Sequence, residues 1–227
     1  DLRIALDVTR VKGRNHPYIK STLDSEKKHK QDRAYKIAFL KTSTWKNAES
    51  YTKEAIEKFA HNLSKEKNVN IEEIEFSPEL SSIHQNHNLI YEKALSYYFS
   101  DEIENSRGDI SEIFLEMTDR GKLTTVEEYH KGLETQVMHM KEFDELSQKY
   151  DFFITNSVSG VAPRLDNPIE PDDPCLIWTY LHAPSITLPL FAGPNDLPFG
   201  LQMASSRYKD DELLNMAETI EQKYIGE

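Results

Sequence analysis

Apolar and polar residues in the first third of the chain follow two patterns in turn. An uninterrupted apolar run, YKIAFLKT at residues 35–42, predicts a short buried strand. From Ala48 to Leu63 apolar residues recur at helical spacing, and NVNIEEIEF, which ends at Phe76, returns to a strand pattern. Strand, helix and strand in this order predict a right-handed βαβ unit with a parallel pair of strands. A sheet covered by helices follows as the architecture.

The middle third carries apolar stripes at spacings of three and four, which predict helices. The first helix is predicted from Pro78 to about Glu104, and the second contains Ile110 to Met117 and ends at Gly121. The third and longest begins with a cap at Thr124 or Thr125 and runs to about Tyr150. We expect the stripes to pack in a core; they comprise Ile83, Ile90, Ala94, Tyr97, Tyr98, Ile110, Ile113, Phe114, Met117, Val126, Tyr129, Leu133, Val137, Met140 and Phe143.

The last third predicts a short buried strand, a long loop, a hairpin and a helix. DFFIT at residues 151–155 is the strand, and the proline-rich loop NSVSGVAPRLDNPIEPDDP leaves its carboxyl end. SITLPL and LPFGLQMAS form a hairpin across the turn AGPND, and a helix starts at Asp210. With a short helix from Leu2 to Val11, the predicted fold class is α/β, a mixed sheet flanked by helices.

Composition narrows the function classes. The 227 residues predict one large domain, in which residues 21–33, STLDSEKKHKQDR, are too polar to bury a face and are interpreted as a mobile linker. A net charge of -12 argues against nucleic-acid partners. No stretch approaches the roughly 20 apolar residues of a membrane span. The single cysteine, Cys175, favours a reducing compartment, so we predict a cytoplasmic location without membrane association.

Few residues of this sequence lie in patterns that indicate catalysis or metal binding. His84 and His87 lie one helical turn apart, but no third ligand stands at a recognisable spacing, so no metal site is predicted. Cys175 and His182 lack a pattern that brings them together, and an inert thiol is the favoured interpretation. Ser159 follows a strand, yet NSVSG departs from the G-x-S-x-G motif and shows no local base. His139 is interpreted as a buried, hydrogen-bonded histidine.

The nearly uncharged segment LIWTYLHAPSITLPLFAGPNDLPFGLQ, residues 176–202, resembles the closing segment of the amidase signature family. In that family a strand that ends in proline is followed by a G-x-LP-x-GLQ hairpin. The resemblance extends to LRIALDVTRVKG, to KIAFLKTSTW and to DFFITNSVSGVAP, which is similar to the family's late strand and threonine-proline loop. Asn156 departs from the pattern, because proline is usual at its position.

The resemblance implies a central mixed sheet and catalysis by a lysine, a bridging serine and a nucleophilic serine. None of these three catalytic residues can be assigned to a position in this sequence, because it contains no glycine- and serine-rich block and has only eight scattered glycines. What carries over are walls of the substrate pocket: Thr155, Val158 and Ser159 on the loop, and Trp178 before the hairpin. The resemblance implies no cofactor and no catalytic residue within this chain.

Three hypotheses follow. The chain is the C-terminal part, residues 1–227, of a single amidase-like domain, inactive by itself, whose full-length protein takes an amide substrate. Alternatively, it is a non-catalytic amidase-like binding or scaffolding protein. The third hypothesis is an independent enzyme that uses Ser159, Cys175 or His182. Because an incomplete sheet leaves an edge uncovered, the first hypothesis also predicts homo-oligomers that form through this edge.

Overall fold

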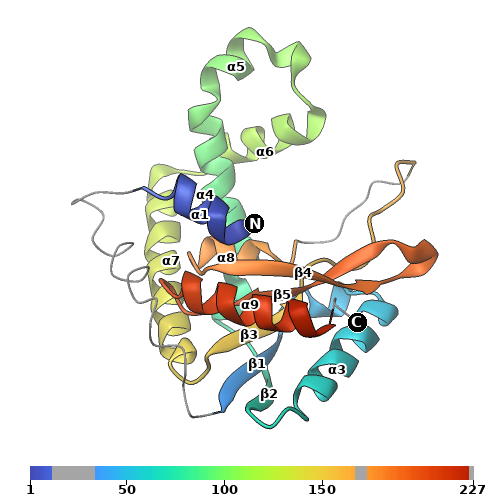
Figure 1. Ribbon diagram of the computed structural model, residues 1–227. Helices are drawn as coiled ribbons and strands as arrows, with labels where there is room; N and C mark the ends of the chain where they lie inside the picture. Colours follow the sequence, from blue (N-terminus) through green and yellow to red (C-terminus); the bar gives the residue numbers. More distant parts are fainter. Residues whose placement is uncertain (12–33, 167–172, 225–227) are drawn as a thin grey trace. The chain divides into compact units, whose positions relative to one another are not determined.

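The computed structural model describes residues 1–11, 34–166 and 173–224 (Figure 1). The predicted linker at residues 21–33 lies outside the described residues. The chain forms two compact units, one made of Asp1–Phe76 and Asp144–Glu227 and the other of Ser77–Phe143.

The first unit contains a five-stranded mixed sheet in the order β2-β1-β3-β5-β4. The strands are β1 (Tyr35–Lys41), β2 (Val69–Glu75), β3 (Phe152–Asn156), β4 (Ser185–Ala192) and β5 (Pro198–Ala204). β1 is parallel to β2 and β3, whereas β5 is antiparallel to both β3 and β4. The predicted α/β fold class, the parallel pair and the hairpin are confirmed.

The centre of the sheet is apolar because β1 and β3 are covered on both faces. Ile37 and Phe39 alternate with Ala38 and Leu40, and all four side chains are at most 4% exposed. Phe39 belongs to the main core, which also contains residues of α3 (Ser50–Leu63) and α9 (Asp210–Tyr224). Figure 1 shows α3 and α9 beside the sheet. All five residues of β3 are buried, as expected for an apolar run in a central strand.

Two further helices belong to the first unit. The amino-terminal helix α1 (Leu2–Thr9) contacts α9, because Arg3 forms an ion pair with Asp211 at 2.9 Å and donates a hydrogen bond to the side chain of Asn215. The short helix α8 (Leu176–Tyr180) lies before β4 and has three buried side chains. The sequence pattern did not predict α8.

The second unit is helical. It contains α4 (Ile83–Tyr98), α5 (Ser100–Asn105), α6 (Glu112–Leu123) and most of α7 (Val126–Ser147), with short 3₁₀ turns at Leu80–Ser82 and Arg107–Asp109. Gly121 does not end its helix as predicted, since α6 continues to Leu123. An added Cβ at Gly121 would lie 1.9 Å from the carbonyl oxygen of Glu92, so glycine allows α6 to approach α4 closely.

Two expectations for the helical unit are wrong. The helix predicted from Pro78 to Glu104 is interrupted at Phe99, whose φ of -107° and ψ of 22° leave the helical region. Tyr97 and Tyr98 in the last turn before this break are 74% exposed rather than packed in a core. Ile113, Val126 and Val137 are exposed as well. Helical spacing identifies a stripe but does not establish that another element covers it.

His139 is buried, as predicted, with 5% of its surface exposed. Burial lowers the pKa of its imidazole, and the negative charges of Glu142 and Glu79 oppose this shift. Among the residues of the two units that the structure describes, no helix combines the length and apolar character that crossing a bilayer requires.

Candidate functional site

The loop that leaves the carboxyl end of β3 is held by side chains of the strand itself. Thr155 is fully buried, and its hydroxyl donates a hydrogen bond to Oδ1 of Asn156 at 3.2 Å. The amide nitrogen of the Asn156 side chain donates to the carbonyl oxygen of Val158 at 3.0 Å. At the position where the resemblance expects proline, asparagine therefore fixes the first turn of the loop through its side chain.

A second set of hydrogen bonds joins this loop to the hairpin. The Ser157 hydroxyl donates to the carbonyl oxygen of Gly200 at 3.0 Å. Sγ of Cys175 lies 3.0 Å from both the carbonyl oxygen of Ser157 and Oε1 of Gln202, so its single S–H can serve either acceptor. The Thr187 hydroxyl also donates to Oε1 of Gln202, at 2.7 Å. Cys175 thus links the β3 loop to the glutamine of the GLQ motif.

The environment of Cys175 makes its thiol a poor nucleophile. Burial, together with the nearby carboxylate of Asp173, which disfavours a second negative charge, raises the pKa of Cys175 to about 12. Since the thiolate is the reactive form of cysteine, almost none is present at neutral pH. These contacts favour the interpretation of Cys175 as an inert thiol.

A cavity of about 670 Å³ adjoins the β3 loop. One wall is the loop segment from Val158 to Arg164, and Asp173, Pro174 and Pro198 line it from the other side. Asn47 and Glu49, which precede α3, and Tyr51 in its first turn complete the lining. The cavity therefore lies where β1 and β3 end, which is the side of an open α/β sheet on which ligands bind.

Tyr51 and Glu49 fix the loop from across the cavity. The backbone N–H of Glu49 donates to the carbonyl oxygen of Ser159 at 2.8 Å, and the N–H of Val161 donates to the hydroxyl oxygen of Tyr51 at 2.8 Å. An added Cβ at Gly160 would lie 2.3 Å from the same hydroxyl oxygen. Glycine at position 160 therefore permits the loop to pack against Tyr51.

The four residues predicted as pocket walls occupy two different environments. Val158 and Ser159 line the cavity, and Val158 is 42% exposed. Thr155 and Trp178 are buried beside the loop and are not among the described residues that line the cavity. The Trp178 ring packs on Phe153, with ring centroids 6.2 Å apart. Thr155 and Trp178 therefore lie in the packed interior rather than at the wall of this cavity.

Sequence reasoning missed Glu49 and Tyr51, although one signal pointed to them. The carboxyl ends of parallel strands meet at one edge of a sheet, so the segment after the first predicted strand must lie beside the segment after the late strand. The observed parallel pairing of β1 with β3 brings residues 42–51 near this loop, whereas the predicted βαβ unit did not identify which side chains reach it.

The lining offers binding groups without a complete catalytic set. Ser159 Oγ is buried and has no hydrogen-bond partner within the described part of the chain. Neither lysine nor histidine is among the described lining residues, and Glu49 and Asp173 are its carboxylates. A serine nucleophile needs a base within hydrogen-bond reach. Within residues 1–11, 34–166 and 173–224, no three His, Cys, Asp or Glu side chains are grouped as a metal site requires.

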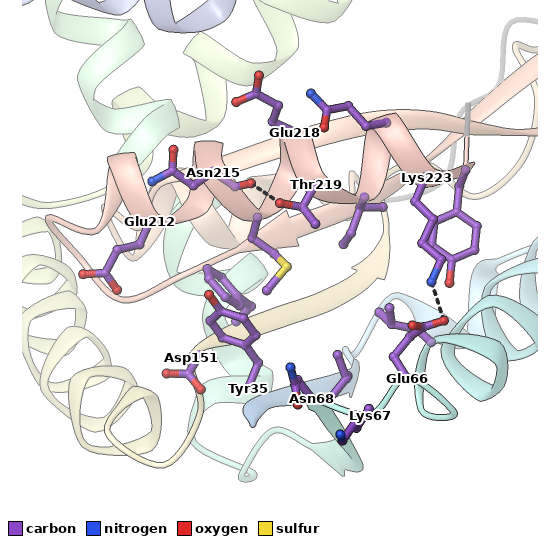
Figure 2. Close-up of a pocket in the computed structure, with 17 residues that line it drawn as sticks. Tyr35, Glu66, Lys67, Asn68, Asp151, Glu212, Asn215, Glu218, Thr219 and Lys223 are labelled. Carbon is purple, nitrogen blue, oxygen red and sulfur yellow. Dashed lines mark hydrogen bonds and ion pairs between the residues drawn. The ribbon is translucent and has the colours of Figure 1, made fainter. Parts of the chain in front are cut away.

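A second cavity, of about 610 Å³, lies at the opposite ends of the parallel strands (Figure 2). It is lined by the first residues of β1 and β2, Tyr35 and Val69, and by one side of α9. Figure 2 shows Lys223 of α9 directed at Glu66, and these side chains form an ion pair at 2.5 Å. Its position at the amino ends of the strands makes it a weaker candidate than the cavity beside the β3 loop.

Known proteins share sequence and structure with this chain. A family model described as Amidase matches residues 1–214. Among curated proteins, a glutamyl-tRNA(Gln) amidotransferase subunit of Treponema denticola is 26% identical over 104 residues, which cover 42% of this chain and 21% of that protein. The matched segment therefore spans about a fifth of that relative's length.

Solved structures share the fold. A crystal structure of an amidase superposes with a TM-score of 0.73 at 13% identity, covering 86% of this chain and 47% of that protein. For 6-aminohexanoate cyclic dimer hydrolase the TM-score is 0.70 at 14% identity, with 96% and 50% covered. For the corresponding glutamyl-tRNA(Gln) amidotransferase subunit of Thermotoga maritima it is 0.62 at 19% identity, with 84% and 42% covered.

Proposed function

Because this chain belongs to the amidase family, we propose that it is part of a hydrolase of carboxamide C–N bonds and supplies one wall of the amide pocket. The observation that carries the proposal is the cavity at the carboxyl end of β3, whose lining includes Val158 and Ser159. A site built at this end of the sheet can bind an amide between the β3 loop and the start of α3.

The catalytic residues are proposed to lie outside these 227 residues. In the family that this sequence resembles, a neutral lysine takes a proton through a bridging serine while the second serine attacks the amide carbonyl. The amine leaves, and water then hydrolyses the acyl-enzyme. The sequence has no glycine- and serine-rich block, and the described cavity lining has no lysine. This chain would position the substrate while the missing groups perform the reaction.

A direct test compares the 227-residue chain with the in-frame product of the same gene that includes any upstream coding sequence. We expect the chain alone to release no ammonia or amine from a panel of aryl and aliphatic amides. It should also remain unlabelled by a fluorophosphonate probe. The longer product should hydrolyse at least one amide and become labelled at a serine upstream of Asp1.

Two outcomes separate the alternatives. If the chain alone hydrolyses amides and Ser159→Ala abolishes both turnover and labelling, the chain is an independent enzyme and the proposal is wrong. If the gene encodes no lysine with a glycine- and serine-rich block upstream of Asp1, and its product is inactive, the proposal is wrong. The alternative of a non-catalytic binding protein is then favoured.

A further inference from the structure

The cavity beside the β3 loop retains hydrogen-bonding capacity that the protein does not use. The hydroxyl oxygen of Tyr51 accepts a hydrogen bond from Val161, and no acceptor for the hydroxyl hydrogen is present among the described residues. A buried hydroxyl without a partner, such as that of Ser159, is energetically unfavourable. Because Ser159 lines the cavity, rotation about its Cα–Cβ bond is a route by which this hydroxyl reaches a ligand. The hydroxyl groups of Tyr51 and Ser159 are thus two O–H donors that can form hydrogen bonds with a carbonyl oxygen of a ligand.

Carboxylates outnumber cations among the described residues that line the same cavity. Arg164 is the only cationic residue among its described lining residues, and it forms a bidentate pair with Asp166 through two hydrogen bonds of 2.8 Å. This pair is internally neutral. The carboxylates of the described lining are those of Glu49 and Asp173.

Apolar surface separates these polar groups. Val158, Val161, Ala162, Pro163, Pro174 and Pro198 contribute to the walls. Such a wall accommodates the hydrocarbon part of a ligand.

We propose that this cavity selects amides that carry a positively charged amine. The inference rests on the proposed function, since it assumes that the cavity holds the amide substrate. Tyr51 donates a hydrogen bond to the amide carbonyl, the apolar wall contacts the hydrocarbon segment, and the carboxylates of Glu49 and Asp173 attract the ammonium group.

The test uses three ligands of similar shape and different charge, measured by isothermal titration calorimetry with the whole protein. The cationic probe is para-(aminomethyl)benzamide, the neutral probe is para-ethylbenzamide, and the anionic probe is para-carbamoylphenylacetate. At low salt we expect the cation to bind about five- to tenfold more tightly than the neutral probe, and the anion to bind most weakly. Raising the salt concentration to about 0.5 M should reduce these ratios.

Substitutions in the cavity test whether the preference for cationic amides arises there. Glu49→Gln and Asp173→Asn should each reduce the cation-to-neutral ratio about two- to threefold. Asp166→Asn should also reduce the ratio, because it leaves Arg164 without its partner. Glu218→Gln is the matched control, since it removes one negative charge at the second cavity and should leave the ratio unchanged. Circular dichroism verifies that each variant is folded.

The outcomes distinguish this inference from the proposed function. Equal binding of the cationic and neutral probes, or a ratio that responds to Glu218→Gln but not to the cavity variants, would overturn the charge preference while the amide pocket stands. Failure of all three amides to bind would overturn both. Tyr51→Phe should weaken all three probes by a similar factor, and a loss confined to the cation would contradict the assigned role of Tyr51.

Discussion

Gly200, in the GLQ motif, shows how the absence of a Cβ atom at one position determines the packing beside the site. A Cβ at this position would lie 2.3 Å from Cγ2 of Thr187 and 3.0 Å from the carbonyl oxygen of Leu188. Both neighbours belong to β4, so a methyl group would push the two hairpin strands apart. Gly200 is therefore required by close packing of β4 on β5, and its carbonyl oxygen also anchors Ser157 of the cavity loop.

We predict that Gly200→Ala lowers the free energy of unfolding by about 1–3 kcal/mol, the usual cost of overpacking. Urea denaturation followed by circular dichroism measures the change. Gly108→Ala is the control, because an added Cβ there meets no atom within 4 Å, and it should change stability by less than about 0.5 kcal/mol. Equal effects of the two substitutions would contradict the packing argument.

Cys175 provides a second prediction at this scale. Its pKa of about 12, against an ordinary value of 9.0, implies roughly a thousandfold less thiolate at neutral pH than in an exposed cysteine. Iodoacetamide should therefore alkylate the folded protein about a thousandfold more slowly than the urea-unfolded protein at the same pH. The rate of the folded protein should rise about tenfold for each pH unit.

Mass spectrometry after timed quenching measures both rates. Rapid alkylation of the folded protein at neutral pH would show that the thiol is ionised. That result would restore Cys175 as a candidate nucleophile.

At the scale of elements, the capping sequence at the start of α7 is a local signal that predicted the structure correctly. The sequence TTVEE predicts a cap at Thr124 or Thr125, and the structure selects Thr125. The Glu128 N–H donates to Oγ1 of Thr125 at 3.2 Å, and the Thr125 N–H donates to Oε2 of Glu128 at 2.8 Å. This reciprocal pair is a capping box. It also lowers the pKa of Glu128, because the Thr125 N–H and hydroxyl stabilise the carboxylate.

We predict that Thr125→Ala destabilises the protein by about 1 kcal/mol, because it removes the side-chain cap of α7. The adjacent Thr124→Ala, which leaves the capping box intact, should cost less than about half of that amount. Urea denaturation of the two variants gives the comparison. A larger loss for Thr124→Ala would mean that the capping box contributes little.

Elements with a strong local signal were predicted closely, and elements set by tertiary contacts were not. The strand predicted at residues 35–42 is observed at Tyr35–Lys41, since a short apolar run between polar segments has few alternatives. The helix α8 was missed because an apolar five-residue turn has no helical period to detect. Tyr97 and Tyr98 were misplaced because periodicity does not reveal where a neighbouring helix ends.

At the scale of the whole molecule, the cavity required contacts that the sequence does not encode locally. Tyr51 and Val161 are joined by a hydrogen bond across 110 residues. The observed strand order brings their segments to the same edge of the sheet, but side-chain identity at the cavity depends on the path of the loop. The resemblance directed attention to Val158 and Ser159 on that path, and it gave no indication of the opposite wall.

The order of strands also leads to a prediction about assembly. β4 is the end strand of the described sheet, and a single strand, β5, pairs with it. Ser185, Thr187 and Pro189 of β4 are exposed, and the register shifts between Leu188 and Phe191. Proline and irregular register weaken further pairing, whereas the residues before Pro189 retain N–H groups that can pair with another strand.

We therefore expect copies of the chain to associate through the first half of β4, with a mass in sedimentation velocity that rises with concentration. Ser185→Lys should shift the equilibrium toward monomer, because a charged residue on an edge strand opposes pairing with another chain. Ser106→Lys adds the same charge to the helical unit and should leave the association unchanged. A monomer at every concentration would show that this edge does not pair, and equal effects of both lysines would attribute the association to net charge rather than to β4.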